Sequence, residues 1–225
     1  NLVAAGFHPQ VIMSPYRASR VEIDEVVRQA VEHGAGSVKF NPVMSSGRGA
    51  AMAKRGETFG PDEVIELAKY IRGELQSRTP IPLTIGLPPV FSSIADLLRD
   101  ESTGGGCGIR NIIGLLGSGE MALCGVGRNM PDLVFGTLGK DSVRDVWSYN
   151  PTLVQLRKDL NTPFPGICGD CIHASRCLTH CAAYNYLDSG HLIHPSKLCH
   201  VVAERGDFPE SRRKSSPVVE IMNVL

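Results

Sequence analysis

Seven cysteines are the residues of this chain whose type and spacing could do chemistry. None lies before residue 107, and the last five follow the pattern C-x2-C-x5-C-x3-C-x17-C. Thiolates placed so closely along a chain are held by disulfides, by zinc, or by iron and sulfide. The seven are Cys107, Cys124, Cys168, Cys171, Cys177, Cys181 and Cys199.

Metal ligation is favoured over disulfides. An odd number of cysteines leaves one over in a closed disulfide framework. The first residues, NLVAAGFHPQ, lack the charged start and long apolar stretch of a secretion signal. We therefore expect a cytoplasmic protein in a reducing compartment, where thiols stay available as ligands.

The spacing indicates two metal sites. Five cysteines between residues 168 and 199 are one more than a tetrahedral zinc ion or a cubane cluster accepts. Cys107 and Cys124 supply two ligands across a predicted hairpin and need at least one more. The surplus cysteine is therefore expected to be shared with them.

Composition argues against two classes of partner. The 23 basic side chains balance 23 acidic ones, so there is no overall field to hold a nucleic acid or an anionic membrane. No apolar run reaches the length that spans a bilayer. We expect a globular protein with no nucleic acid and no membrane partner.

The first half of the chain predicts alternating strands and helices. Short apolar runs at 10–16, 37–43 and 81–87 suit buried strands, and helical periodicity follows the first run and covers 61–76. The connections are too short for anything but a crossover onto the same sheet. This pattern predicts a βαβ unit.

Two further predictions concern the first helix of this half and the segment 45–60. Ser19 or Asp24 is expected to cap the first helix, and Val21 is expected on its packed face with Val27. The glycine-rich, basic segment 45–60 could contact a phosphate or nucleotide at the carboxyl end of a strand. A mobile surface connection is favoured, because neither phosphate-loop nor dinucleotide spacing is met.

The second half predicts a hairpin and a broken helix. Two apolar segments surround Gly117–Gly119 within 108–126, which places Cys107 at one end of a hairpin and Cys124 in its return strand. The stretch 141–160 predicts a helix interrupted near Asn150–Pro151. Irregular backbone from 162 to 169 suits a metal site, and the basic tail after residue 204 predicts a solvated extension carrying Arg212, Arg213 and Lys214.

The cysteine register resembles the SPASM domain, the C-terminal extension of many radical S-adenosylmethionine (radical SAM) enzymes. Cys107 is followed by eleven residues, Gly119, four residues and Cys124, and the five later cysteines match the family's spacing. SVRDVW, at 142–147, is similar to the family's usual helix. The first half, with GSVKFNPV and GRG, resembles the last strands of the partial (β/α) barrel that precedes such domains.

The resemblance implies an α/β fold in four parts. Residues 1–90 would be the C-terminal strands and helices of the radical SAM partial barrel, 91–104 a linker, 105–205 an irregular Cys-rich α+β SPASM domain with a β-hairpin, and 206–225 a tail. It also implies two auxiliary [4Fe-4S] clusters. The first would be held by Cys107, Cys124 and Cys181, and the second by Cys168, Cys171, Cys177 and Cys199.

The chain departs from the family in three respects. The first auxiliary cluster has only three cysteines, so its fourth iron position would be open or filled by another side chain. Thr179 and His180 stand where the family commonly has two glycines. The C-x3-C-x2-C motif that binds the cofactor-cleaving cluster is absent, so we expect S-adenosylmethionine and a third [4Fe-4S] cluster in an N-terminal part preceding this sequence, with a degenerate protein as the alternative.

Three functions follow as hypotheses. The favoured one is part of an enzyme that modifies a peptide or protein, by crosslinking or by oxidising a side chain, with flavodoxin or ferredoxin as reductant. A structural zinc module is the first alternative, and a non-catalytic electron-transfer or scaffold protein is the second. In the zinc module the second site could be completed by His173, His180, His191, His194 or His200.

Overall fold

The computed structural model describes residues 1–45, 47–99, 108–126 and 130–214. The chain divides into two compact units, Asn1–Gly105 and Gly106–Leu225, and each has its own apolar core. The first unit contains a parallel sheet and the second an antiparallel one. The chain is therefore of mixed α/β class, and the two units are described separately below.

The first unit contains the predicted βαβ arrangement. Its strands are β1 (Gln10–Met13), β2 (Ser37–Phe40) and β3 (Leu83–Ile85), shorter than the predicted runs and parallel in the order β1-β2-β3. The first crossover holds a 3-10 turn, η2 (Ala18–Glu22), and α1 (Ile23–Glu32). The second holds α2 (Gly49–Lys54) and α3 (Pro61–Tyr70), which runs on into a π-helical turn, η3 (Ile71–Leu75). After β3 come the 3-10 turn η4 (Pro89–Phe91) and α4 (Ile94–Arg99), the latter inside the predicted linker.

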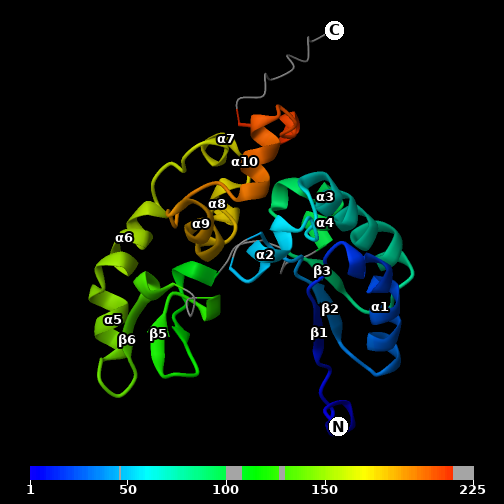
Figure 1. The fold of residues 1–225 in the computed structure, drawn as a ribbon, viewed down its shortest axis with the longest axis horizontal. Helices are drawn as coiled ribbons and strands as arrows, with labels where there is room; N and C mark the ends of the chain where they lie inside the picture. Colours follow the sequence, from blue (N-terminus) through cyan, green and yellow to red (C-terminus); the bar gives the residue numbers. More distant parts are fainter. Residues whose placement is uncertain (46, 100–107, 127–129, 215–225) are drawn as a thin grey trace, which may run out of the picture. The chain divides into compact units, whose positions relative to one another are not determined.

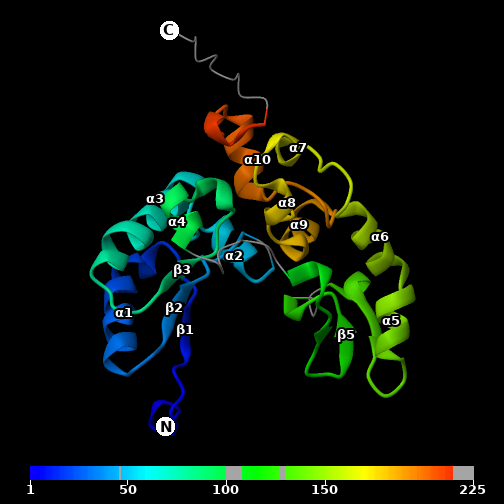
Figure 2. The same ribbon diagram turned by 180° about the vertical axis from the view of Figure 1, so that it is seen from behind.

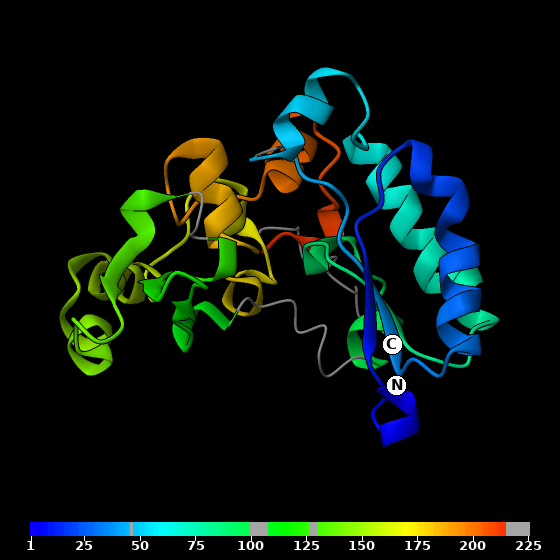
Figure 3. The ribbon, with the colours of Figure 1, turned by 60° about the horizontal axis from the view of Figure 1, so that its bottom comes forward.

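Both crossover helices pack on one face of the sheet. Figure 3 shows α1 and α3 side by side on the same side of the strands. Their apolar residues share a core with the buried residues of β2, of which Val38 and Phe40 are 0% exposed. The other face of the sheet carries Gln10, Lys39 and an Ile12 that is 59% exposed. The alternation along each strand thus gives one apolar and one open face.

The start of α1 differs from the prediction. The α1 N-cap is Glu22, which makes no capping bond through its side chain. The Ser19 hydroxyl instead accepts the backbone N–H of Tyr16, at 2.9 Å, within the preceding turn. Val21 is 84% exposed rather than packed, because η2 turns at about three residues per turn and shifts the buried face before the α-helix begins.

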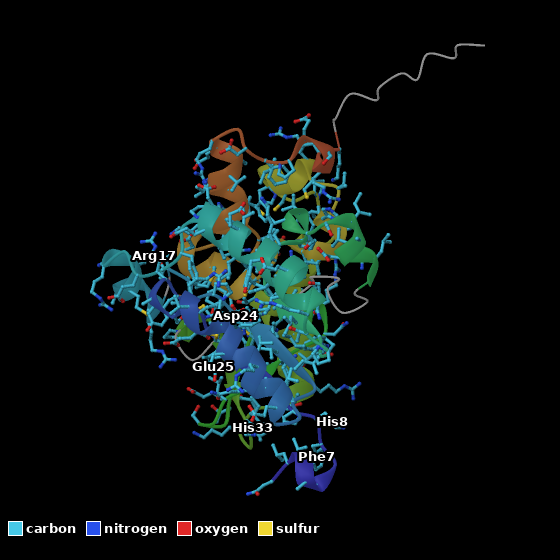
Figure 4. All side chains as sticks on the ribbon, turned by 90° about the vertical axis from the view of Figure 1, so that its right-hand side faces the viewer. Phe7, His8, Arg17, Asp24, Glu25 and His33 are labelled. Atoms are coloured by element: carbon cyan, nitrogen blue, oxygen red, sulfur yellow. The ribbon has the colours of Figure 1, made fainter. Side chains whose placement is uncertain are left out.

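The described part of the glycine-rich segment, residues 45 and 47–60, is hydrogen-bonded to Arg17 near its end. It contains α2, and the Arg17 guanidinium binds its Gly56 carbonyl. The same guanidinium meets both carboxylate oxygens of Glu63, at 2.8 and 2.6 Å. Glu63 also accepts the N–H of Gly60 and so caps α3. Figure 4 shows Arg17 beside this segment, while Asp24 and Glu25 project from α1.

The second unit confirms the predicted hairpin and the predicted helix break. Strands β4 (Gly114–Leu115), β5 (Glu120–Ala122) and β6 (Val134–Thr137) form an antiparallel sheet, with Gly119 at φ 84° in the first turn. Cys124 lies two residues beyond β5 rather than in the return strand. Asn150 separates α5 (Val143–Tyr149) from α6 (Pro151–Asp159), and its side chain accepts the N–H groups of Thr152 and Leu153.

Four short helices form the cysteine-rich end of this unit. They are α7 (Ile167–Asp170), α8 (Ala174–Cys177), α9 (Ala182–Ser189) and α10 (Lys197–Glu204), and the 3-10 turn η8 (Glu210–Arg212) follows them. In Figures 1 and 2 the segment after α10 turns back beside α7. Phe208 is 4% exposed, so residues 208–214 are a docked segment and not the solvated extension that the sequence predicted. In the part of the chain described, none of the helices has the length and apolar character needed to cross a bilayer.

Candidate metal centre

The second predicted set of ligands lies on three short helices and one turn. Cys168 is in α7, Cys171 follows it directly, Cys177 ends α8 and Cys199 is in α10. All four thiols are buried and free of disulfides. Position 169, directly after Cys168, requires glycine, because a Cβ there would lie 2.6 Å from the carbonyl oxygen of Phe164.

These four thiols lie within electrostatic range of one another. Burial, and then the proximity of Cys199, Cys177 and Cys171, raises the pKa of Cys168. Burial and Cys199 raise the pKa of Cys177 to about 12, and burial raises that of Cys199 to about 11. The thiols are therefore protonated in the metal-free chain and would release protons on binding a metal.

Positive groups gather around Cys171. Its sulfur accepts the backbone N–H of His173 at 3.4 Å. Burial raises the pKa of Cys171, while that hydrogen bond and the nearby Lys214 and Arg212 act in the opposite direction. Hydrogen bonds and cations around a sulfur stabilise its anionic form, whether as a thiolate or as a metal ligand.

Two cysteines of the first predicted set form a separate group. Cys124 and Cys181 both act electrostatically on the phenol of Tyr184, whose pKa is raised by burial and by these two thiols. Cys181 is the N-cap of α9 and Tyr184 lies in its first turn. Cys107 lies outside the described residues. Tyr184 is thus a residue of this group that the cysteine pattern alone did not indicate.

A strained turn separates the two groups. Leu178, Thr179 and His180 have φ angles of 51°, 63° and 72°, in the left-handed region that costs a non-glycine residue about 1–2 kcal/mol. The buried Asn185 holds this turn by donating to the carbonyl and hydroxyl oxygens of Thr179. The turn directs Cys177 and Cys181, four positions apart, into different groups.

The five candidate histidines differ in their surroundings. His173 and His180 lie between the cysteines of 168–181. The Nε2 atom of His173 is buried and has no hydrogen-bond partner among the described residues, and burial lowers the pKa of His180 to about 4. Of the other candidates, His191 is exposed, His194 lies edge-on to His200, and His200 faces Glu204.

No preformed site for a metal ion is present in the described parts of the chain. Among residues 1–45, 47–99, 108–126 and 130–214, no three His, Cys, Asp or Glu side chains are arranged so that they could hold a metal ion. The thiols are thus neighbours that do not converge on one point.

The four buried thiols offer the number and kind of ligands that either a zinc ion or a cubane cluster uses. A zinc ion draws four sulfurs to one centre, whereas a cubane spreads its four ligand sulfurs around four irons. Cys168, Cys171, Cys177 and Cys199 fit that ligand set in number, chemistry and burial. Cys124 and Cys181 would supply two ligands of a second set.

No protein-family model and no curated protein matches this chain. The assignment of a function therefore depends on the residues and their geometry. Besides Tyr184, sequence analysis missed Asn185 and the return of Arg212 and Lys214 to the Cys171 turn. Of these, Tyr184 lies three residues after Cys181, a spacing that a helix such as α9 brings together, but no helix was predicted there from the sequence.

Proposed function

We propose that this chain is the auxiliary [4Fe-4S]-binding part of a radical SAM enzyme with a SPASM domain, acting on a peptide or protein. The observation that carries the proposal is the burial of Cys168, Cys171, Cys177 and Cys199 as mutually interacting free thiols. Cys124 and Cys181, beside Tyr184, form a second and separate group. Their spacing along the chain is that of the family.

The first unit supports an origin in a (β/α) barrel. Its parallel strands follow chain order, and both crossover helices cover the same face. Doubly wound sheets place helices on both faces, whereas barrels place helices outside and turn the other face inward. The open face with Gln10, Ile12 and Lys39 would then line the interior of the larger barrel.

Each group of thiols would have its own cluster. Cys168, Cys171, Cys177 and Cys199 would hold the second auxiliary cluster, and Cys124, Cys181 and Cys107 the first. Such clusters supply electron transfer, or an iron position that anchors substrate. S-adenosylmethionine, the third cluster and the C-x3-C-x2-C motif would belong to residues outside this sequence, and the reductant would be a flavodoxin or ferredoxin.

The protein side chains have separate tasks in this proposal. Burial of the four thiols excludes water, and the His173 N–H holds the sulfur of Cys171. Lys214 and Arg212 offset negative charge at the same ligand. Asn185 fixes the turn that keeps the two groups apart. Tyr184 lines the group that has the smaller number of cysteines.

The test is the content of iron, acid-labile sulfide and zinc in protein purified without oxygen. We expect about eight irons and eight sulfides per chain, the content of two cubanes. About two zinc ions without sulfide would overturn the proposal and leave a structural zinc module. A matched variant, Ser175→Ala, changes an exposed residue between two ligands and should keep the full content.

A further inference from the structure

The Cys168-x2-Cys171 pair contains two backbone carbonyls that need partners. Gly169 and Asp170 end α7, which is only 4 residues long, and the last carbonyls of a helix have no N–H of that helix to accept. The Ile172 N–H, which a longer helix would direct at such a carbonyl, donates to another segment of the chain. Both carbonyls therefore depend on donors from elsewhere.

One residue, Lys214, supplies both donors. Its backbone N–H donates to the carbonyl of Asp170 at 2.7 Å, and its ammonium group donates to the carbonyl of Gly169 at 2.9 Å. The second bond joins residues 45 positions apart. A lysine cation at the last carbonyls of a helix also suits the negative end of the helix dipole. Lys214 thus caps α7 from a distant part of the chain.

Backbone pairing holds Lys214 in this position. We call residues 208–214 the return segment. Its Arg213 forms an antiparallel β-bridge with Cys171, and the Ile172 N–H donates to the Arg212 carbonyl at 3.0 Å. The return segment is therefore paired with the ligand turn on both sides of Cys171.

Side chains anchor the return segment as well. Phe208, at its start, is 4% exposed, and the Arg213 guanidinium stands 5.8 Å from the centre of its ring. Arg213 also lies 3.6 Å from Asp170 and 3.5 Å from Glu210. These contacts place Lys214 at the end of α7 in the chain without metal, so no ordering of the segment has to accompany metal binding.

We propose that Lys214 is a positioning residue of the second auxiliary cluster, which bonds both carbonyls between Cys168 and Cys171 and so fixes the spacing of these two ligands. The inference rests on the proposed function. The charge of the same residue is felt at the ligand, because burial raises the pKa of Cys171 while Lys214 acts in the opposite direction.

Two measurable effects follow from this role. Partners that orient metal ligands from outside the ligand set typically contribute about tenfold or more to metal affinity. A reduced cluster has one more negative charge than an oxidised one, so a nearby cation favours the reduced form and raises the reduction potential. Removing Lys214 should therefore speed the loss of the second cluster and lower its potential.

The first test follows the release of iron to a chelator from full-length chains loaded without oxygen. Lys214→Ala removes the ammonium group and keeps the N–H, whereas Lys214→Pro removes both donors. Proline fits at this position because the preceding Arg213 has extended backbone, with φ −89° and ψ 144°. We expect about four irons to leave about tenfold faster in Lys214→Pro and less accelerated in Lys214→Ala, while the other four leave at the parent's rate.

The second test is the reduction potential of the second cluster, followed by electron paramagnetic resonance. Lys214→Ala should lower it, and Lys214→Arg should restore it, because arginine keeps the charge and the donors. Lys214 is exposed, so these variants leave the core intact. Lys140→Ala is the matched control, since Lys140 is exposed in the loop between β6 and α5, which Figure 1 shows at the opposite end of the second unit from α7.

Iron and sulfide contents of the parent chain separate this inference from the proposed function. A parent without iron and sulfide overturns the proposed function, and with it the cluster that Lys214 would serve. A loaded parent whose iron release and potential are unchanged by the Ala and Pro variants overturns the positioning role alone. Equal effects in Lys140→Ala, or a potential that Lys214→Arg does not restore, have the same consequence.

Discussion

The side-chain amide of Asn185 donates to both the carbonyl oxygen and the hydroxyl of Thr179, at 3.0 and 3.1 Å. Thr179 is the middle one of three successive left-handed residues. The same amide reaches the carbonyl of His194 at 2.7 Å. One buried side chain thus joins a strained turn to the loop before α10, which carries Cys199.

Replacing Asn185 with leucine should destabilise the second unit. The change leaves buried carbonyl groups without a donor, at a cost of about 1–3 kcal/mol. Denaturant unfolding measures the loss of free energy, and the exposed Asn111→Leu is the control. Equal stabilities of the two variants would contradict the role assigned to Asn185.

Cys177 and Cys181 should serve different clusters although they lie four positions apart. Cys177→Ser and Cys181→Ser should each remove about four irons and leave the other cluster in place. Electron paramagnetic resonance of the reduced variants should then show one missing signal, and a different one in each. Loss of the same signal from both variants would contradict the separation of the groups.

The two faces of the parallel sheet should tolerate substitution differently. Phe40→Ala empties a site that is 0% exposed and should cost about 3–5 kcal/mol. Ile12→Ala, at a position that is 59% exposed, should cost about 0.5 kcal/mol or less. Thermal or denaturant unfolding of the first unit measures both.

The Ile12→Ala variant also tests the barrel proposal. In a longer protein that completes the barrel, Ile12 would face an enclosed interior. Ile12→Ala should then cost clearly more than in the present chain. An unchanged cost in the longer protein would argue against a closed barrel on that face.

The Arg17–Glu63 pair should make the first unit sensitive to acid. The guanidinium of Arg17, followed by the Gly60 N–H, lowers the pKa of Glu63 in the folded chain. A lowered folded-state pKa adds stability above the unfolded carboxyl pKa of about 4.3, and that stability is lost as pH falls through the lowered value.

Arg17→Met tests this dependence on pH. The variant should have a lower Tm than the parent at pH 7, and the difference should shrink below about pH 4. Arg28→Met is the comparison, because the ion pairs of Arg28 among the described residues are with Glu25 and Glu32 of its own helix. Arg28→Met should lower Tm less than Arg17→Met does. A Tm difference between Arg17→Met and the parent that stays constant from pH 7 to pH 3 would contradict the role assigned to the Arg17–Glu63 pair.

Local features of the fold were predicted from the sequence. The turn at Gly119 and the helix break at Asn150–Pro151 depend on backbone preferences of a few adjacent residues. The crossover between β1 and β2 follows from periodicity and chain length. The turn, the helix break and the crossover were therefore set by residues close to one another in the sequence.

Long-range features needed the tertiary structure. The exposure of Val21 depends on a 3-10 turn that shifts the packed face of α1. The fixing of segment 45–60 depends on Arg17, which contacts Glu63 across 46 positions. No local pattern specifies such a contact.

The sequence by itself determined which residues are candidate metal ligands and how far apart they lie along the chain. Only the tertiary structure decided which thiols are neighbours, because the left-handed turn at 178–180 sends Cys177 and Cys181 to different groups. It also decided that residues 208–214 return to Cys171. Backbone pairing and the burial of Phe208 there outweigh the solvation that the charged side chains of residues 208–214 would otherwise favour.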